Sequence, residues 1–233
     1  MKLDSSKVAI ITGVTRGIGR ALLDALVQRG VRVVACARDE KRIADLAASA
    51  RFLGKDAIFV EGDVRETQTA ATLVAQAEEN FGGVDLVVNN AGLINGPGNV
   101  EDLSTEQWRD VLDVNLMGAV FLCRAAVPSL RARGGGVILN MSSYWGHVGE
   151  AAFGPYCASK FAVEGLSQTL AAETKRDNII VVAVRPGMVV TDMLDVATRG
   201  HAQGHKPAEQ CAHQLVEVVE NLTIADTGIP KDL

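Results

Sequence analysis

The apolar residues of this chain occur in short continuous runs, separated by longer stretches in which apolar positions recur at helical spacing. The runs are rich in Val and Ile and do not alternate with polar residues. Six of them span residues 7–12, 31–36, 57–60, 84–89, 137–141 and 179–184, and a weaker segment lies near Ile229. Strands that are apolar on both faces are typical of parallel sheets covered by helices on both sides. We therefore expect one parallel sheet.

The stretches between the runs predict helices. Ser104 and Gln107 fit a capping box that starts a long helix to about Arg133, and Gly30 fits the end of the first helix. The apolar stripes that define two of the helices are Ile18, Ala21, Leu22, Ala25 and Leu26, then Leu73, Val74, Ala77 and Phe81. An alanine-rich helix to about Leu53 and a helix from Pro155 complete the set. Alternating strands and helices predict an α/β fold: a single domain over residues 1–233 with a doubly wound, Rossmann-type parallel sheet and helices on both faces.

Composition narrows the class of protein. The chain has 233 residues, of which 48% are hydrophobic, and a net charge of −5, so we expect one packed domain. The sequence has no basic cluster that would suggest a nucleic-acid partner. The first residues lack the apolar core of a signal peptide, and no apolar run approaches the ~20 residues of a membrane span. Four scattered cysteines fit a reducing compartment. These features predict a cytoplasmic protein without a membrane partner.

Three glycines, Gly13, Gly17 and Gly19, lie between the first predicted strand and the first predicted helix. Glycine at this place lets the backbone approach a pyrophosphate, which binds at the helix N-terminus. The Gly-Lys-Ser/Thr sequence of a P-loop is absent. An ordinary turn is the alternative, and the flanking strand and helix favour a dinucleotide site.

Tyr156 and Lys160 are four residues apart at the start of a predicted helix, so both side chains lie on one face. A nearby ammonium favours the phenolate and would lower the tyrosine pKa, which makes the phenol useful as an acid or base. The pair alone also occurs by chance in many helices.

The Tyr156–Lys160 pair is one of several motifs that follow one another along the chain, which favours a functional pair over a chance one. The stretch 12–19, Thr-Gly-Val-Thr-Arg-Gly-Ile-Gly, precedes Asn89-Asn90-Ala91-Gly92, then Asn140-Met141-Ser142-Ser143, then the Tyr156–Lys160 pair, then Pro186-Gly187. From about Lys7 to Thr191 the chain resembles the short-chain dehydrogenase/reductase family, which transfers hydride between a nicotinamide cofactor and a carbonyl or alcohol. The C-terminal forty residues match that family poorly.

The resemblance implies a catalytic set of Asn115, Ser143, Tyr156 and Lys160. Tyr156 would be the general acid or base, and Ser143 would bind the same substrate oxygen and stabilise its charge. Lys160 would lower the tyrosine pKa and hold the ribose hydroxyls. Asn115 would help to hold a water-mediated proton path to the lysine.

The resemblance also implies the cofactor contacts. The glycine loop would contribute Gly13, Thr15, Arg16, Gly17, Ile18 and Gly19. Asp63 and Val64 would meet the adenine, and Asn89, Ala91 and Gly92 would border the adenosine ribose. Pro186, Gly187, Val189 and Thr191 would meet the nicotinamide half. Ala37 stands where an NAD-specific member has an acid, and Arg16 and Arg38 suit a 2′-phosphate, so we expect NADP(H). Arg38 could instead be a solvated residue at a helix start.

The substrate side is less defined. Trp145, Glu150 and Phe153 lie where the family lines its substrate pocket, although Trp145 and Phe153 could equally be core residues. Residues 189–207 are expected to form a substrate lid, with a loop over 194–207. His201 and His205 lie in that loop without a glutamate between them, and we expect no metal site.

These features predict an NADP(H)-dependent reductase of ketones or aldehydes, or the reverse alcohol dehydrogenase. A catalytically silent nucleotide sensor or scaffold of the same fold is the alternative, although the catalytic set is intact. An epimerase or dehydratase of the longer related family would need an additional substrate domain. The resemblance implies that the helices from Ser104 and from Pro155, which are rich in small residues, form a dimer interface. We expect a homodimer or homotetramer.

Overall fold

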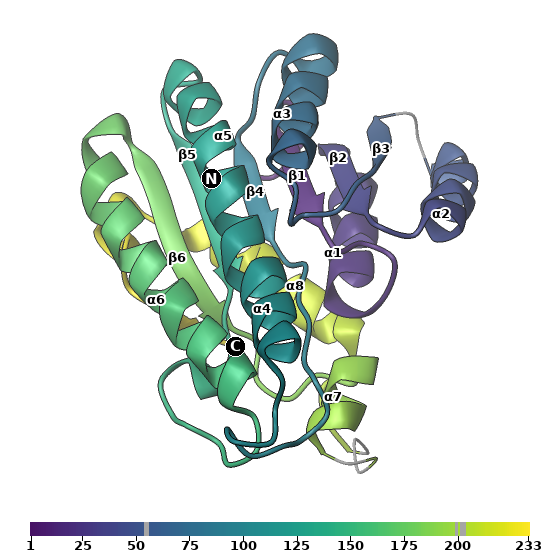
Figure 1. Cartoon of the computed structure of the whole chain (residues 1–233). Coiled ribbons are helices and arrows are strands. Elements are labelled where there is room, and N and C mark those ends of the chain that lie inside the picture. Colours follow the sequence, from purple (N-terminus) through teal and green to yellow (C-terminus); the bar gives the residue numbers. More distant parts are fainter. Residues whose placement is uncertain (54–55, 199, 201–203) are drawn as a thin grey trace.

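A computed structural model describes residues 1–53, 56–198, 200 and 204–233 of the chain. Its described residues form a seven-stranded sheet in the order β3-β2-β1-β4-β5-β6-β7, and every pairing is parallel (Figure 1). The strands are β1 (Val8–Thr12), β2 (Arg32–Ala37), β3 (Ala57–Glu61), β4 (Leu86–Asn89), β5 (Gly136–Met141), β6 (Ile179–Arg185) and β7 (Lys231–Asp232). The predicted parallel sheet is confirmed, and each apolar run forms a strand.

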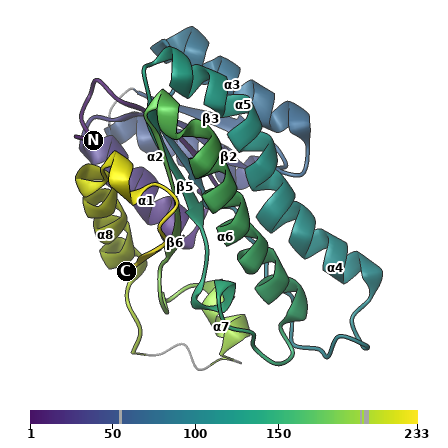
Figure 2. The ribbon, with the colours of Figure 1, turned by 90° about the vertical axis from the view of Figure 1, so that its left-hand side faces the viewer.

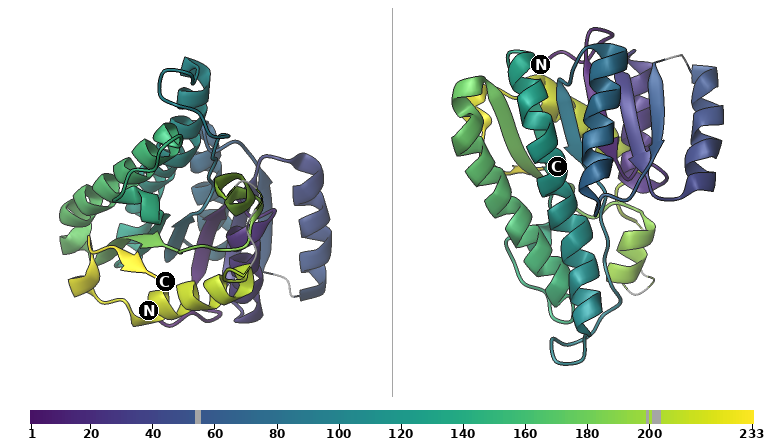
Figure 3. Two further views of the ribbon diagram at one scale, coloured as in Figure 1. Left: turned by 90° about the horizontal axis from the view of Figure 1, so that it is seen from below. Right: turned by 45° about the horizontal axis from the view of Figure 1, so that its top comes forward.

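Helices cover both faces of the sheet (Figures 2 and 3). One layer contains α1 (Gly17–Gln28), α2 (Glu40–Leu53) and α8 (Ala208–Asn221). The other contains α3 (Thr67–Phe81), α4 (Thr105–Leu112), α5 (Gly118–Ala132) and α6 (Gly154–Thr174). Residues of alternate parity on each strand contribute to two separate apolar cores, one under each layer. The doubly wound Rossmann-type fold is therefore confirmed.

The predicted long helix is present and begins with the predicted capping box. Gln107 N–H donates to Ser104 Oγ (3.2 Å), and Ser104 N–H donates to Gln107 Oε1 (2.8 Å). Between α4 and α5 the chain continues through a π-helical turn, Asp113–Met117, that the periodicity did not predict. Such turns often mark functional positions.

By length and composition, Thr105–Ala132 is also the one helix among the described residues that is long and apolar enough to cross a membrane. This corrects the expectation that no apolar stretch of the chain approaches the length of a membrane span. Core helices of soluble proteins pass it as well. Here the helix packs against α3 and α6, which is the setting of a core helix.

The segment expected to be a loop begins as a short helix, α7 (Asp192–Ala197). Thr191 caps it, because its Oγ1 accepts a hydrogen bond from Leu194 N–H (3.2 Å). Val190, just before α7, donates its N–H to the carbonyl oxygen of Lys206 beyond it (2.9 Å), which ties the two ends of the predicted lid together. Residues 199 and 201–203 of that lid, including His201, lie outside the described residues.

Candidate active site

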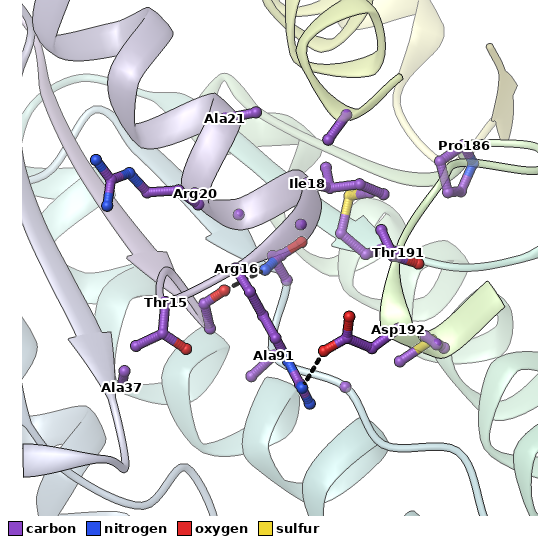
Figure 4. A pocket seen from close by; sticks show the side chains of 18 of the residues that line it. Thr15, Arg16, Ile18, Arg20, Ala21, Ala37, Ala91, Pro186, Thr191 and Asp192 are labelled. Atoms are coloured by element: carbon purple, nitrogen blue, oxygen red, sulfur yellow. Dashed lines mark hydrogen bonds and ion pairs between the residues drawn. The ribbon is translucent and has the colours of Figure 1, made fainter. Parts of the chain in front are cut away.

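A cleft of about 1160 Å³ opens at the edge of the sheet where the parallel strands end. Its centre lies between β1 and β4, where the strand order reverses, which is the usual ligand site of open α/β sheets. The glycine loop, the ends of β2 and β3, the segment after β4, and α7 surround it (Figure 4). Its volume exceeds the ~300–1,000 Å³ of common small-molecule pockets, so it suits an extended ligand.

Most of the predicted cofactor residues line this cleft. They are Gly13, Thr15, Arg16, Gly17, Ile18, Gly19, Arg38, Asp63, Val64, Ala91, Gly92, Tyr156, Lys160, Pro186 and Thr191. Asn89, Gly187 and Val189 do not line it. Gly187 adopts a positive φ of 71° in the turn after β6, and Val189 is buried in the core beneath α8.

The glycines permit close backbone packing at the entry to α1. A Cβ at Gly19 would lie 2.3 Å from the Gly13 carbonyl oxygen, so no other residue fits there without rearrangement. Gly13 has a φ of 73°, and a Cβ would lie 2.8 Å from Ala91 Cα. The loop therefore lies directly against the segment that follows β4, with the N-terminus of α1 facing the cleft.

Asn90, the residue after β4, is bound to the glycine loop. Its Nδ2 donates to Thr12 O (2.9 Å) and Gly13 O (3.0 Å). Asn89 points to the opposite face of the sheet, where its Nδ2 donates to Asn140 Oδ1 (2.8 Å) beside Cys123. The reason is the two-residue period of a strand: Val87 and Asn89 face α5, whereas Leu86 and Val88 face α1.

Two arginines stand at the end of the cleft near β2. Arg16 forms an ion pair with Asp192 of α7, so its guanidinium crosses the cleft mouth (Figure 4). Arg38 lies 3.9 Å from Asp63 and its side chain is 73% exposed. Ala37 ends β2 directly before Arg38 and carries no carboxylate. The end of β2 is thus followed by a positive side chain, whereas the Arg16 guanidinium lies at α7 (Figure 4).

Tyr156 and Lys160 occupy successive turns of α6 and both face the cleft. Both are almost fully buried. Lys160 Nζ donates to Met141 O (2.7 Å) and lies over the Tyr156 ring, 5.5 Å from its centroid. The Tyr156 hydroxyl donates to Met193 Sδ (3.6 Å), which comes from α7.

Burial dominates the titration of this pair. It raises the pKa of the Tyr156 phenol to about 12, and the Ser143 hydroxyl acts in the opposite direction. Desolvation also lowers the pKa of the Lys160 ammonium to about 8. The expected lowering of the tyrosine pKa by Lys160 is therefore wrong for this arrangement, because the cost of burying a charge outweighs the attraction. The phenol is protonated at neutral pH.

Ser143 and Asn115 lie at the edges of the pair. Ser143 follows β5 and caps the turn Tyr144–Gly146, since its Oγ accepts a hydrogen bond from Trp145 N–H (3.2 Å). Asn115 sits in the π-helical turn. Its Oδ1 accepts from Leu93 N–H (2.7 Å), and its Nδ2 donates to Leu93 O and to Ser159 Oγ, both at 2.9 Å. Asn115 thereby joins the segment after β4 to the helix that carries Tyr156 and Lys160.

The three residues proposed for the substrate pocket behave differently from one another. Trp145 stacks on Phe153 with ring centroids 4.9 Å apart, and its edge meets the Tyr156 ring at 6.0 Å. Phe153 is buried at the start of α6, whereas Glu150 is exposed. None of the three lines the cleft described above. Trp145 and Phe153 support the ring of Tyr156 from the side.

The sequence of residues 7–202 matches the model of the short chain dehydrogenase family. The chain belongs to this family. Two relatives illustrate what the chain is similar to. The NADPH-dependent pterin aldehyde reductase of Arabidopsis thaliana is 34% identical over 228 residues, which cover 96% of this chain and 92% of the relative. The trans-4-hydroxycyclohexanecarboxylate dehydrogenase of Sinomonas cyclohexanicum is 38% identical over 205 residues, covering 85% and 78%.

Among solved structures, L-sorbose reductase from Gluconobacter frateurii, complexed with NADPH and L-sorbose, matches with a TM-score of 0.89 and 28% identity. The match covers 100% of this chain and 97% of that one. The short-chain dehydrogenase fold and an oxidoreductase family are therefore established for this chain.

Sequence reasoning did not find several residues at the site of this short-chain dehydrogenase. Asn90, Ser142, Asp192 and Met193 line the cleft. Asp192 and Met193 fall in the expected lid over 189–207, just before the stretch 194–207 that was interpreted as loop, and no helix was predicted there. Thr191, followed by Asp192 and Asp195 in the first turn, was the available signal for a helix. Among the described residues, no group of three or more His, Cys, Asp or Glu side chains could hold a metal ion.

Proposed function

We propose that this short-chain dehydrogenase is an NADP(H)-dependent enzyme that reduces a ketone or aldehyde, or oxidises the corresponding alcohol, with Tyr156 as the proton donor or acceptor. One observation carries the proposal. The glycine loop, two arginines and the buried Tyr156–Lys160 pair, which are far apart in the sequence, line one cleft. We also propose that residues 189–207 form the lid on its substrate side.

The chain offers a cradle that fits a dinucleotide. The tight contact at Gly19 and the positive φ at Gly13 require residues without side chains at these two positions. They lie next to the N-terminus of α1, where backbone N–H groups favour a phosphate. Asp63 and Val64, which line the cleft beyond the end of β3, would meet the adenine. Pro186 and Thr191, which also line it, would meet the nicotinamide half.

The cofactor, when bound, supplies or accepts the hydride, and the side chains of the protein handle the proton. In the reductive direction negative charge develops on the substrate oxygen. The buried phenol of Tyr156, protonated at neutral pH, donates a proton to it, and Ser143 donates a hydrogen bond to the same oxygen. Lys160 places a cationic group next to the ring and stabilises the phenolate that remains.

The charges at the far end of the cleft favour a 2′-phosphate. Arg38 is exposed and only loosely paired with Asp63, so its guanidinium is free to bind an anion. Arg16 can do so by exchanging Asp192 for the phosphate. The relatives support this assignment, because one is named as NADPH-dependent and the sorbose reductase was solved with NADPH.

The proposal is tested by mixing the purified protein with NADPH and a panel of ketones and aldehydes, and following the loss of NADPH absorbance. The same panel with NADH measures cofactor preference. We expect at least one carbonyl to be reduced, with kcat/KM higher for NADPH. Binding of NADPH without turnover of any panel member, or of the matching alcohols with NADP, would instead favour a nucleotide sensor.

Tyr156→Phe tests the role of the phenol. The substitution keeps the ring that packs against Trp145 and under Lys160, so folding and NADPH binding should persist. Turnover should fall by at least the ~10²-fold typical for loss of a general acid. Near-normal turnover in this variant would show that another group provides the proton.

A further inference from the structure

A buried ion pair lies next to the catalytic side chains without facing the cleft. Glu164 follows Lys160 by one turn of α6 and is 6% exposed. Arg185, the last residue of β6, donates to both of its carboxylate oxygens: Nε to Oε1 at 2.8 Å and NH2 to Oε2 at 3.0 Å. This paired geometry is the strong form of a carboxylate–guanidinium contact. Neither residue lines the cleft.

The carboxylate has a second partner, which belongs to the site. Ser142 Oγ donates to Glu164 Oε1 at 2.7 Å, and both groups are buried. Ser142 stands between Met141, whose carbonyl accepts the hydrogen bond of Lys160, and Ser143, the residue proposed to bind the substrate oxygen. The short segment 141–143 is thus attached to α6 at two successive turns, by Lys160 and by Glu164.

The turn after this segment is also packed against the pair. A Cβ at Gly146 would lie 2.4 Å from Ser142 Oγ and 3.2 Å from Glu164 Oε1. The loop that carries Ser143 and Trp145 therefore closes directly onto the Ser142–Glu164 hydrogen bond. A change in the position of the carboxylate would have to move the loop.

We infer that Glu164 is a positioning residue of the active site, which Arg185 holds in place and which fixes through Ser142 the segment that carries Ser143. This role rests on the proposed function, because it concerns the placement of Ser143 and Lys160 relative to the substrate. A misplacement of about 1 Å in such groups can cost on the order of 10²-fold in rate, so a rigid support has a measurable effect.

The test uses two variants that break the link from opposite sides. Glu164→Gln keeps the side-chain shape but removes the charge that Arg185 requires. Ser142→Ala leaves the Glu164–Arg185 pair intact and removes only the hydroxyl, so it keeps the test valid if Glu164→Gln folds poorly. We expect each variant to lower kcat, measured per NADPH-binding site, about tenfold or more. The Kd for NADPH should change by less than about twofold.

Because both substitutions act along one series of contacts, from Arg185 through Glu164 to Ser142, the double variant Ser142→Ala/Glu164→Gln should turn over no more slowly than the slower single variant. Asp177→Asn is the matched control. It breaks another ion pair, to Arg131 at 2.7 Å, in the 3₁₀ turn Lys175–Asp177 at the far end of α6. The control should leave kcat unchanged, whatever it does to thermal stability.

The inference is wrong if Ser142→Ala keeps wild-type kcat, or if the losses of the two single variants multiply in the double variant. It is also wrong if kcat per NADPH-binding site is normal and only the melting temperature falls, since that is the result of a purely structural pair. Failure of the proposed function gives a different result: wild-type protein binds NADPH but reduces no carbonyl.

Discussion

A buried lysine is the most strained residue of the site in electrostatic terms. Lys160 is 4% exposed and donates a hydrogen bond to the Met141 carbonyl, and burial lowers its pKa from 10.5 to about 8. Between these two values the unfolded chain binds the proton and the folded chain does not, so stability rises with pH in that window. Below about pH 8 the full cost of the buried charge is present. At 1.36 kcal/mol per pKa unit, this cost is roughly 3 kcal/mol.

Lys160→Met removes the buried ammonium, so its effect on stability should depend on pH. The unfolding free energy of the variant minus that of the wild type should be roughly 2–3 kcal/mol larger at about pH 7 than at about pH 10. Urea denaturation at both pH values measures the change. Lys175→Met, at an exposed lysine just beyond α6, is the control. A difference between Lys160→Met and wild type that does not vary with pH would show that Lys160 keeps its ordinary pKa. Turnover should be lost in the Lys160 variant, which illustrates a site maintained at the expense of stability.

At the scale of elements, the glycine loop and α7 are joined across the cleft by Arg16 and Asp192. Both side chains are about two-thirds exposed, so the pair contributes only about 0.2–1 kcal/mol. In the proposed function, this pair competes for Arg16 with the 2′-phosphate. Binding of NADPH would then have to break the pair, whereas binding of NADH would not.

Asp192→Asn removes the competitor and should raise NADPH affinity by about two- to fivefold, with little effect on NADH. Fluorescence titration of both cofactors measures this. Asp195→Asn removes the same charge from the same helix and should have a smaller effect, because Asp195 does not pair with Arg16. Weaker NADPH binding in Asp192→Asn, or an equal change for both cofactors, would show that Arg16 does not serve the 2′-phosphate.

The same elements show how far the sequence alone can predict this molecule. Local signals were sufficient where one residue type determines the geometry, as with the capping box at Ser104 and the glycine loop at Gly19. The short helix α7 was missed because six residues give too little periodicity to outweigh the nearby glycines. The choice between Asn89 and Asn90 depended on where β4 ends, and a difference of one residue moves a side chain to the other face.

The titration of Tyr156 could not be predicted from spacing, since a four-residue interval places the ammonium near the ring but says nothing about burial. The roles of Glu164 and Arg185 were equally inaccessible. They come from different elements, α6 and β6, and only the parallel register of β5 and β6 brings Ser142 and Arg185 to the same edge of the sheet. Tertiary contacts of this kind leave no local pattern.

At the scale of the whole molecule, the C-terminal segment is tied to the supports of the site. β7 pairs with the end of β6, Leu233 N–H donates to Arg185 O (3.1 Å), and Asp232 lies 3.5 Å from Arg185 NH1. Arg185 thus touches the last residues of the chain on one side and Glu164 on the other. The family model ends at residue 202, but the relatives align over nearly the whole chain, which corrects the expectation that the C-terminal forty residues match the family poorly. These residues close the sheet beside β6.

The outer face of α6 lies beside α4 and α5, and no other element of the part of the chain that the structure describes covers it (Figure 1). Ala158, Phe161 and Gly165 follow one another along it, and all three are exposed. Phe161 is 47% exposed, and a Cβ at Gly165 would meet nothing within 4 Å. Other small residues of these helices, such as Ala126 and Ala171, face the core instead. An aromatic ring among small residues is suited to close contact with the same face of a second copy.

We therefore predict a homodimer in which the α5 and α6 faces of two copies pack around a two-fold axis. Sedimentation velocity at micromolar concentration should give at least twice the mass of one chain. Phe161→Glu places a charge at the centre of the contact, where it would be desolvated next to its symmetry mate, so it should shift the protein to monomers. Ala44→Glu adds the same charge on the exposed face of α2 and should leave the mass unchanged. A single-chain mass for the wild type would exclude the dimer. A Phe161→Glu protein that remains dimeric would place the contact elsewhere on the molecule.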